Sequence, residues 1–131
     1  MLFLLILPVF FGCQTVTSTM QSSNGQITFE LYDGDGELVS QKQVAYDETD
    51  TLLGLLKENY TVYCQGSDGN PDDSCSYQGP YGYYIMGIDT VTAFTGNVYI
   101  AFYINGSYAM TGIGVTPIVD GNVYQFKLET F

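Results

Sequence analysis

Apolar and polar residues alternate along much of the chain, which is the pattern of β-strands that bury one face. In residues 26–32 (QITFELY), the apolar side chains of Ile27, Phe29 and Leu31 share one side of such a strand. The DGDG sequence at 33–36 is typical of a hairpin turn, and the next ten residues form the returning strand. The pattern therefore predicts a β-hairpin at the start of the folded part.

The pattern changes to a helical period once, within residues 47–60 (DETDTLLGLLKENY). The apolar stripe of this predicted helix consists of Leu52, Leu55 and Leu56. Asp50 or Thr51 can cap its first turn, and Lys57 lies near its negative end. Strand-like patterns then return in four segments, at 60–64, 81–88, 98–104 and 122–131.

A hairpin, one helix and several further strands, in that order, predict an α+β fold. One amphipathic helix can cover only one face of a small sheet. We therefore expect a small mixed sheet with one short helix packed on one face, and the β-grasp arrangement is the natural candidate. The length of 131 residues fits a single domain of this kind.

The segment 98–104 (VYIAFYI) departs from simple alternation because both of its faces are apolar. One face carries Ile100, Phe102 and Ile104, which we expect to pack against the helix. The other face carries Tyr99, Ala101 and Tyr103. If this second face stays open, it forms a binding surface, because tyrosine offers a rigid ring and a hydroxyl together. The alternative is that these residues close a core against neighbouring strands.

Further aromatic or apolar residues in nearby loops can extend this surface, namely Tyr81, Tyr83, Tyr84, Tyr108 and Met110. The region around them is almost free of charge, since Asp89 is the only Asp, Glu, Lys or Arg between Ser74 and Val119. A large, mostly uncharged ligand rich in amide groups would suit such a surface.

The first residues, MLFLLILPVFFGC, predict a targeting segment. Residues 1–12 are too short to span a bilayer and resemble the apolar part of a lipoprotein-type signal peptide. Cys13 would then be lipidated and anchor the chain. Residues 13–25 form a polar tether, which leaves 26–131 as the folded domain. The alternative is a short buried strand with a chance cysteine.

Charge and composition exclude several classes of function. The chain has a net charge of −11, three Lys and Arg residues and no His. It therefore lacks the basic surface that nucleic acid requires, and we expect contact with the membrane through the lipid anchor only. No nucleophile or phosphate-binding motif is present, so we do not expect an enzyme. We expect no resident cofactor either.

The remaining cysteines, Cys64 and Cys75, predict a disulfide that closes a short loop. The alternative is a pair of free thiols. Two thiols without His do not make a zinc site. The loop contains Asp68, Asn70 and Asp72 at alternate positions, as calcium loops do, but it lacks the usual glycine and the final glutamate. We interpret it as a solvated acidic loop and predict no metal.

The segments VYIAFYINGSYAMTG (98–112) and TPIVDGNVYQFKLE (116–129) together resemble the end of the transcobalamin-like C-terminal domain family. The order of the preceding hairpin, helix and YGYYI strand is similar as well, so the resemblance covers nearly all of 26–131. It implies a β-grasp-like domain, which in bacteria occurs as an exported lipoprotein and in animal proteins caps cobalamin. The Asn105-Gly106 pair is also typical of this family, although it suits a hairpin turn in any case.

The resemblance and the residues together predict a lipid-anchored, extracytoplasmic protein that binds a small molecule, with cobalamin or another corrinoid as the favoured ligand. This prediction implies a membrane vitamin transporter as the partner. The candidate ligand-binding residues are Tyr81, Tyr83, Tyr99, Tyr103, Asn105, Tyr108 and Met110. The alternative is a structural or adhesive surface module that binds protein or glycan, because a fold alone does not fix a function.

Overall fold

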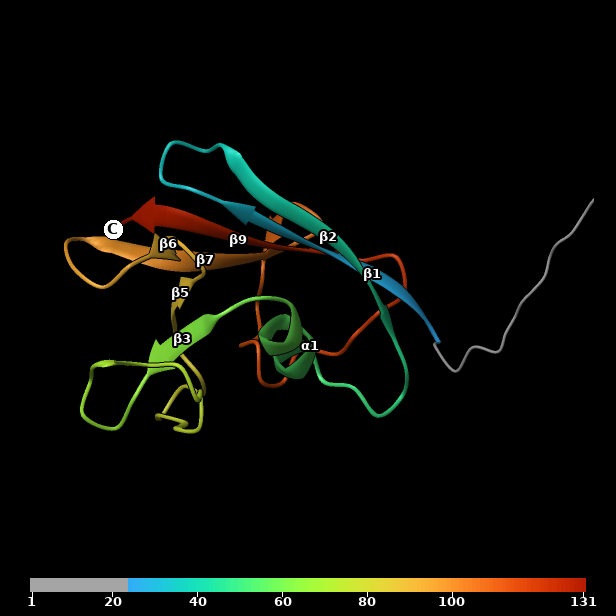
Figure 1. The fold of residues 1–131 in the computed structure, drawn as a ribbon, viewed down its shortest axis with the longest axis horizontal. Helices are drawn as coiled ribbons and strands as arrows, with labels where there is room; N and C mark the ends of the chain where they lie inside the picture. The colour runs from blue at the N-terminus through green and yellow to red at the C-terminus, as the bar shows by residue number, and fades with distance from the viewer. Residues whose placement is uncertain (1–23) are drawn as a thin grey trace, which may run out of the picture.

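The structure, a computed structural model, describes residues 24–131 and contains two β-sheets and one helix within them (Figure 1). The strands are β1 (Gly25–Tyr32), β2 (Leu38–Tyr46), β3 (Val62–Gln65), β4 (Pro71–Asp72), β5 (Ile85–Ile88), β6 (Val91–Thr92), β7 (Val98–Ile104), β8 (Ser107–Tyr108) and β9 (Val123–Thr130), and the helix is α1 (Leu52–Asn59). The predicted signal peptide at 1–12 and the lipidated Cys13 lie outside the described residues, as does most of the predicted tether. Strand β1 begins at Gly25, one residue before the expected start of the domain.

The larger sheet has five strands in the order β2-β1-β9-β7-β8. Its two central strands, β1 and β9, run parallel, and all other neighbours in it are antiparallel. Alternate residues of β1 are buried, as the sequence pattern predicts, because Ile27, Phe29 and Leu31 are at most 1% exposed. Tyr124 and Phe126 of β9 are buried beside them, so the centre of this sheet supplies much of the core.

The smaller sheet has the order β4-β3-β5-β6 and is antiparallel throughout. Figure 1 shows α1 and β3 on the same side of the larger sheet. The core lies in this space, where the helix and the smaller sheet contribute their buried residues to one cluster with the larger sheet. The far side of the larger sheet, turned away from α1, is called the outward face below.

Helix α1 is shorter than the predicted segment 47–60 and begins after a defined cap. The Oγ1 atom of Thr51 accepts a hydrogen bond from the backbone N–H of Gly54 at 3.1 Å. The expected stripe of Leu52, Leu55 and Leu56 is buried, and so is Leu53. The helix therefore packs one broad apolar side into the core.

The α+β class is confirmed by the mixed sheet and the single short helix within the described residues. The second sheet was not predicted. The segments 60–64 and 81–88 do contain strands, but these pair with one another instead of joining the larger sheet. Each is short and apolar, and nothing in such a run specifies which strand it will pair with.

The predicted disulfide is present, with Cys64 and Cys75 joined by an S–S bond of 2.07 Å. Both residues are buried, and the bond ties the end of β3 to the long segment that leads to β5. Within residues 24–131, no helix is both long enough and apolar enough to span a bilayer.

Candidate functional site

An aromatic pocket of about 230 Å³ lies where the two sheets meet beside β7. Tyr83 and Tyr84 reach it from the segment before β5, Tyr99 and Phe102 from β7, and Tyr108 from β8. The loop at 109–113 closes another side. Two parts of the chain that are distant in the sequence thus build its walls, namely the segment before β5 and the stretch from β7 to the loop at 109–113. The name aromatic pocket is kept for this site.

The floor and the rim of the aromatic pocket differ in character. Ile100, Ile113 and Phe126 line the floor and are at most 8% exposed. Tyr84 and Tyr108 stand at the rim and are 43% and 55% exposed. An apolar floor with tyrosine hydroxyls around it can hold the uncharged edge of a ligand and orient its amide or hydroxyl groups.

Asn105 and Gly106 place Tyr108 at this site through a tight turn. Both residues have positive φ angles, +52° and +85°, which the turn between β7 and β8 requires. The turn sets Tyr108 opposite Tyr103, with ring centroids 5.3 Å apart. The side chain of Asn105 is already engaged, because its Oδ1 accepts from the N–H of Val123 at 2.8 Å. Asn105 therefore acts on the turn and does not line the pocket.

The glycine that follows the closing loop, Gly114, leaves room for the ring of Tyr83. A Cβ atom on Gly114 would lie 2.8 Å from Cδ2 of Tyr83, which is closer than two carbon atoms can approach. Gly112 has more room, since a Cβ there would meet only the carbonyl oxygen of Tyr81, at 3.8 Å. The position of the Tyr83 ring therefore depends on Gly114.

The predicted site residues divide into three groups in the structure, and the first group is Asn105 and Tyr103, which lie beside the aromatic pocket without lining it. Tyr83, Tyr99 and Tyr108 line the aromatic pocket together. Tyr81 and Met110 do not line it and project into solvent, 97% and 93% exposed. In the loop 109–113, sequence reasoning selected Met110 and missed the residues that line the pocket, Ala109, Thr111, Gly112 and Ile113. A loop without charge or motif gives no sign of which of its residues close a pocket.

Tyr103 lies next to the aromatic pocket but on the outward face, where it shares an acceptor with Tyr99. Its hydroxyl donates to Oε2 of Glu129 at 2.6 Å, and the Tyr99 hydroxyl donates to Oε1 of the same carboxylate at 3.2 Å. The hydrogen bond to Glu129 raises the pKa of Tyr103 to about 12. The neighbouring hydroxyl of Tyr108, and then burial and Glu129, raise the pKa of Tyr99. Both phenols therefore stay neutral at physiological pH.

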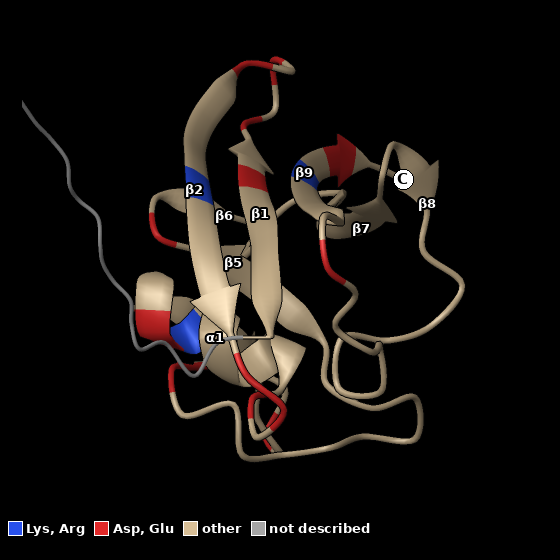
Figure 2. Cartoon of the chain, turned by 90° about the vertical axis from the view of Figure 1, so that its right-hand side faces the viewer, with Lys and Arg blue, Asp and Glu red and all other residues tan. Residues whose placement is uncertain are grey.

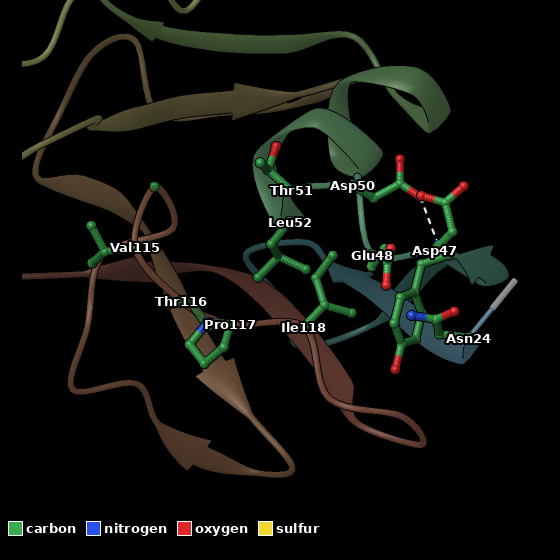
Figure 3. A pocket seen from close by; sticks show the side chains of 12 residues that line it. Asn24, Asp47, Glu48, Asp50, Thr51, Leu52, Val115, Thr116, Pro117 and Ile118 are labelled. Carbon is green, nitrogen blue, oxygen red and sulfur yellow. Dashed lines mark hydrogen bonds between the residues drawn. The ribbon is translucent and has the colours of Figure 1, made fainter.

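A second, larger pocket of about 490 Å³ lies between the turn before α1 and residues 115–118 (Figure 3). We call it the acidic pocket, because Asp47, Glu48 and Asp50 line one side of it. Two of these carboxylates stabilise their own turn. Asp50 accepts from the N–H of Asp47 at 2.9 Å, and Asp47 accepts from the N–H of Thr49 at 2.8 Å. Hydrogen bonds from Thr49 hold the pKa of Asp47 below its usual value.

The acidic loop closed by the disulfide shows the same local use of carboxylates. Asp68 accepts from the N–H of Asn70 at 3.0 Å, and Asp72 accepts from the N–H of Ser74 at 2.9 Å. These backbone hydrogen bonds lower the pKa values of Asp68 and Asp72. Among residues 24–131, no three His, Cys, Asp or Glu side chains come together in a way that could hold a metal ion.

The region around the aromatic pocket carries few charges. In Figure 2, β7, β8 and the loop beyond them are coloured as uncharged residues, whereas acidic residues gather at turns elsewhere. This agrees with the sequence, in which Asp89 is the only Asp, Glu, Lys or Arg between Ser74 and Val119. A ligand that binds here meets a nearly neutral surface.

The fold resembles two solved structures. One is a Ruminococcus gnavus protein described as a proposed metal binder, with a TM-score of 0.59 and 22% identity, covering 82% of this chain and 99% of that one. The other is haptocorrin, of the transcobalamin family, in complex with Cbi, with a TM-score of 0.60 and 12% identity. That match covers 89% of this chain but only 27% of the haptocorrin chain.

No protein-family model matches the chain, and no curated protein is significantly similar to it in sequence. At these identities the two structural likenesses establish a shared fold and nothing finer. The chain therefore shares the fold of one part of the haptocorrin chain.

Proposed function

We propose that this chain binds a small, largely uncharged molecule at the aromatic pocket, with a corrinoid as the favoured ligand. The observation that carries the proposal is the pocket itself, in which tyrosines from β7, β8 and the segment before β5 surround an apolar floor. Ligand sites in proteins are commonly apolar hollows with a few polar groups that fix orientation.

The size of the pocket defines how such a ligand would bind. A volume of about 230 Å³ is smaller than the ~300–1,000 Å³ typical of sites that enclose a drug-sized ligand. A corrinoid would therefore insert one side group and spread the rest of its surface over the exposed rings of Tyr84 and Tyr108. Tyr81 and Met110 extend outward from neighbouring loops and can contact a ligand of that size.

The likeness to haptocorrin supports the choice of ligand class, because that structure contains Cbi. Since the shared part is 27% of the haptocorrin chain, this domain alone would supply one side of a binding site. The parallel pairing of β1 with β9 at the centre of the larger sheet supports a β-grasp-like arrangement. Lipid anchoring through Cys13 and delivery to a membrane transporter complete the proposal and rest on the sequence.

The proposal is tested by titrating cobalamin and cobinamide separately into the purified chain and following the corrinoid absorbance. We expect a saturable spectral shift with at least one of them. Tyr84→Ala and Tyr108→Ala should each weaken binding about tenfold, the order expected for one aromatic contact. Tyr77→Ala is the matched control, because Tyr77 is similarly exposed, at 40%, but lies outside the pocket.

Two results would contradict the proposal. One is the absence of any spectral shift with either corrinoid when circular dichroism shows a folded chain. The other is an equal loss of affinity in Tyr77→Ala and in the two pocket variants, which would place the ligand elsewhere.

A further inference from the structure

The outward face of the larger sheet carries an organised set of polar and aromatic side chains that do not line the aromatic pocket. Every second residue of β1, β2 and β9 points to this side, because the residues between them are in the core or point toward it. The residues that form the set are Glu30, Tyr32, Gln41, Gln125, Lys127 and Glu129. The outward face therefore has a composition of its own.

Glu30 is the centre of a hydrogen-bonded group on this face. Its carboxylate accepts from the Tyr32 hydroxyl at 2.7 Å, from Nε2 of Gln41 at 2.8 Å and from Nε2 of Gln125 at 3.0 Å. Burial alone would raise the pKa of Glu30, but these three hydrogen bonds and Lys127 lower it overall. Three strands thus hold one ionised acceptor in a fixed position.

Lys127 orders the aromatic rings beside this group. Its Nζ atom lies 5.1 Å from the ring centroid of Tyr32 and 4.5 Å from that of Tyr103. The Tyr103 hydroxyl is held in turn by Glu129. The two rings therefore stand on either side of a fixed ammonium group, and little side-chain freedom remains to be lost when a partner binds.

Two hollows adjoin this ordered group. One, of about 430 Å³, is lined by Thr28, Glu30, Gln41, Gln43 and Val123. The other, of about 710 Å³, lies at the end of the sheet, where Tyr32, Lys127 and Glu129 adjoin the turn at 33–36. Glu30 and Tyr32, which hydrogen-bond to each other, connect the two. From Thr28 to Asp33 an extended strand rises about 16 Å, which is enough for a short linear polymer.

We propose that the outward face binds a neutral glycan chain along β1, through these two hollows. The groups on offer are carboxylates, side-chain amides and tyrosine hydroxyls, which pair with sugar hydroxyls as donors and acceptors. The Tyr32 ring, which lines the second hollow, supplies apolar surface for the C–H faces of the sugars.

Charge and backbone pairing favour this partner over others. Glu30, Glu129, Asp33 and Asp35 outnumber Lys127 around the two hollows, so a polyanion such as nucleic acid or a sulfated glycan would be repelled. The backbone groups of β1 and β9 are used within the sheet, since each of these strands has a neighbour on both sides. An extended peptide could therefore not add a strand at this place.

The test is affinity electrophoresis of the full chain in gels that contain a neutral β-glucan, a neutral mannan or heparin. We expect at least one neutral polysaccharide to retard the chain and heparin to have no effect. The double variant Gln41→Ala, Gln43→Ala should weaken the retardation about tenfold or more. Gln65→Ala is the matched control, because Gln65 is an exposed strand residue of the smaller sheet, and it should behave as the wild type.

The results of the glycan test can be distinguished from those of the corrinoid titration. The glycan proposal predicts that Tyr84→Ala leaves the retardation unchanged and that the Gln41, Gln43 double variant leaves corrinoid binding unchanged. The proposal is overturned if both neutral polysaccharides leave the mobility unchanged, if heparin alone retards the chain, or if the double variant is retarded as strongly as Gln65→Ala.

Discussion

The aromatic pocket and the acidic pocket are built on the two halves of one loop, yet they differ in almost every property. Residues 109–113 close the aromatic pocket, and residues 114–118 line the acidic one. The aromatic pocket faces a part of the chain that is nearly free of charge. The acidic pocket faces Asp47, Glu48 and Asp50. The uneven placement of charge along the sequence therefore reappears as two chemically distinct hollows.

The difference also shows that the larger hollow is the weaker candidate for ligand binding. The acidic pocket has about twice the volume, at 490 Å³ against 230 Å³. Its Asp47 and Asp50 carboxylates, however, accept hydrogen bonds from their own turn and are used in starting α1. The side chains of Tyr84 and Tyr108, at the rim of the aromatic pocket, are more than two-fifths exposed. Part of each ring is therefore free to contact a ligand.

The largest expected effect on stability comes from removing the disulfide, which ties down the segment that carries Tyr83 and Tyr84 of the aromatic pocket. Cys64→Ala combined with Cys75→Ala should lower the free energy of unfolding by about 3 kcal/mol, the order expected for a short closed loop. Denaturant unfolding measures this loss. Hydrogen exchange should then speed up in 65–84, which carries Tyr83 and Tyr84, and remain slow near Thr51. Equal loss of protection around both pockets would mean that the two regions are not independent.

Gly114→Ala should have the next largest effect, because the new Cβ would lie 2.8 Å from the Tyr83 ring. Displacing that ring is expected to cost about 1–3 kcal/mol of the free energy of unfolding and to weaken ligand binding at the aromatic pocket. Gly112→Ala is the control for stability, since its Cβ would meet only the carbonyl oxygen of Tyr81, at 3.8 Å, which is an ordinary contact. Similar unfolding midpoints for the two variants would show that Tyr83 is not held by this contact.

Thr51→Ala changes a residue that lines the acidic pocket, and it should have a smaller effect on the free energy of unfolding. The loss of the hydrogen bond from the Gly54 N–H should lower the free energy of unfolding by about 1 kcal/mol. Thr51→Ser keeps the acceptor and should retain most of the stability. Because Thr51 lines the acidic pocket and does not line the aromatic pocket, corrinoid affinity should not change. A parallel fall in affinity would mean that the helix start communicates with the aromatic pocket.

The smallest expected effect is a loss of stability at alkaline pH that arises from Tyr103, which lies beside the aromatic pocket. The pKa of Tyr103 is raised from 10 to about 12 in the folded state. The unfolded state therefore loses this proton first, and the free energy of unfolding should fall as the pH rises from about 10 to 12. Tyr103→Phe lacks this contribution, so its decline over the same interval should be shallower. Urea unfolding at pH 9 and pH 11.5 makes the comparison, and equal declines would contradict the assigned hydrogen bond to Glu129.

The parts of the fold that follow from local pattern could be predicted from the sequence. The alternation of Ile27, Phe29 and Leu31, the DGDG turn and the leucine stripe each act over a few residues, and all three are found in the structure. The pairing of Cys64 with Cys75 followed from counting cysteines. The division of the strands into two sheets did not, because pairing depends on contacts between distant segments.

The candidate site shows the same division between local and distant information. Tyr83, Tyr99 and Tyr108 stood out as tyrosines in an uncharged region, and the structure brings them together. Tyr81 is also a tyrosine and Met110 is also apolar, and both lie in neighbouring loops, but they point into solvent. The direction in which a loop side chain points is set by its backbone turn and by neighbours such as Gly114, and composition does not encode it.

The central position of β9 has a consequence for how this chain acquires its fold. Gln125 and Glu30 touch across the middle of the larger sheet although 95 positions separate them. During synthesis β1 leaves the ribosome long before its inner neighbour exists, so Phe29 has no finished core to enter until nearly the whole chain has emerged. Contacts of such long range slow folding. A nascent chain of this kind would gain from a chaperone that shields the early hairpin until β9 arrives.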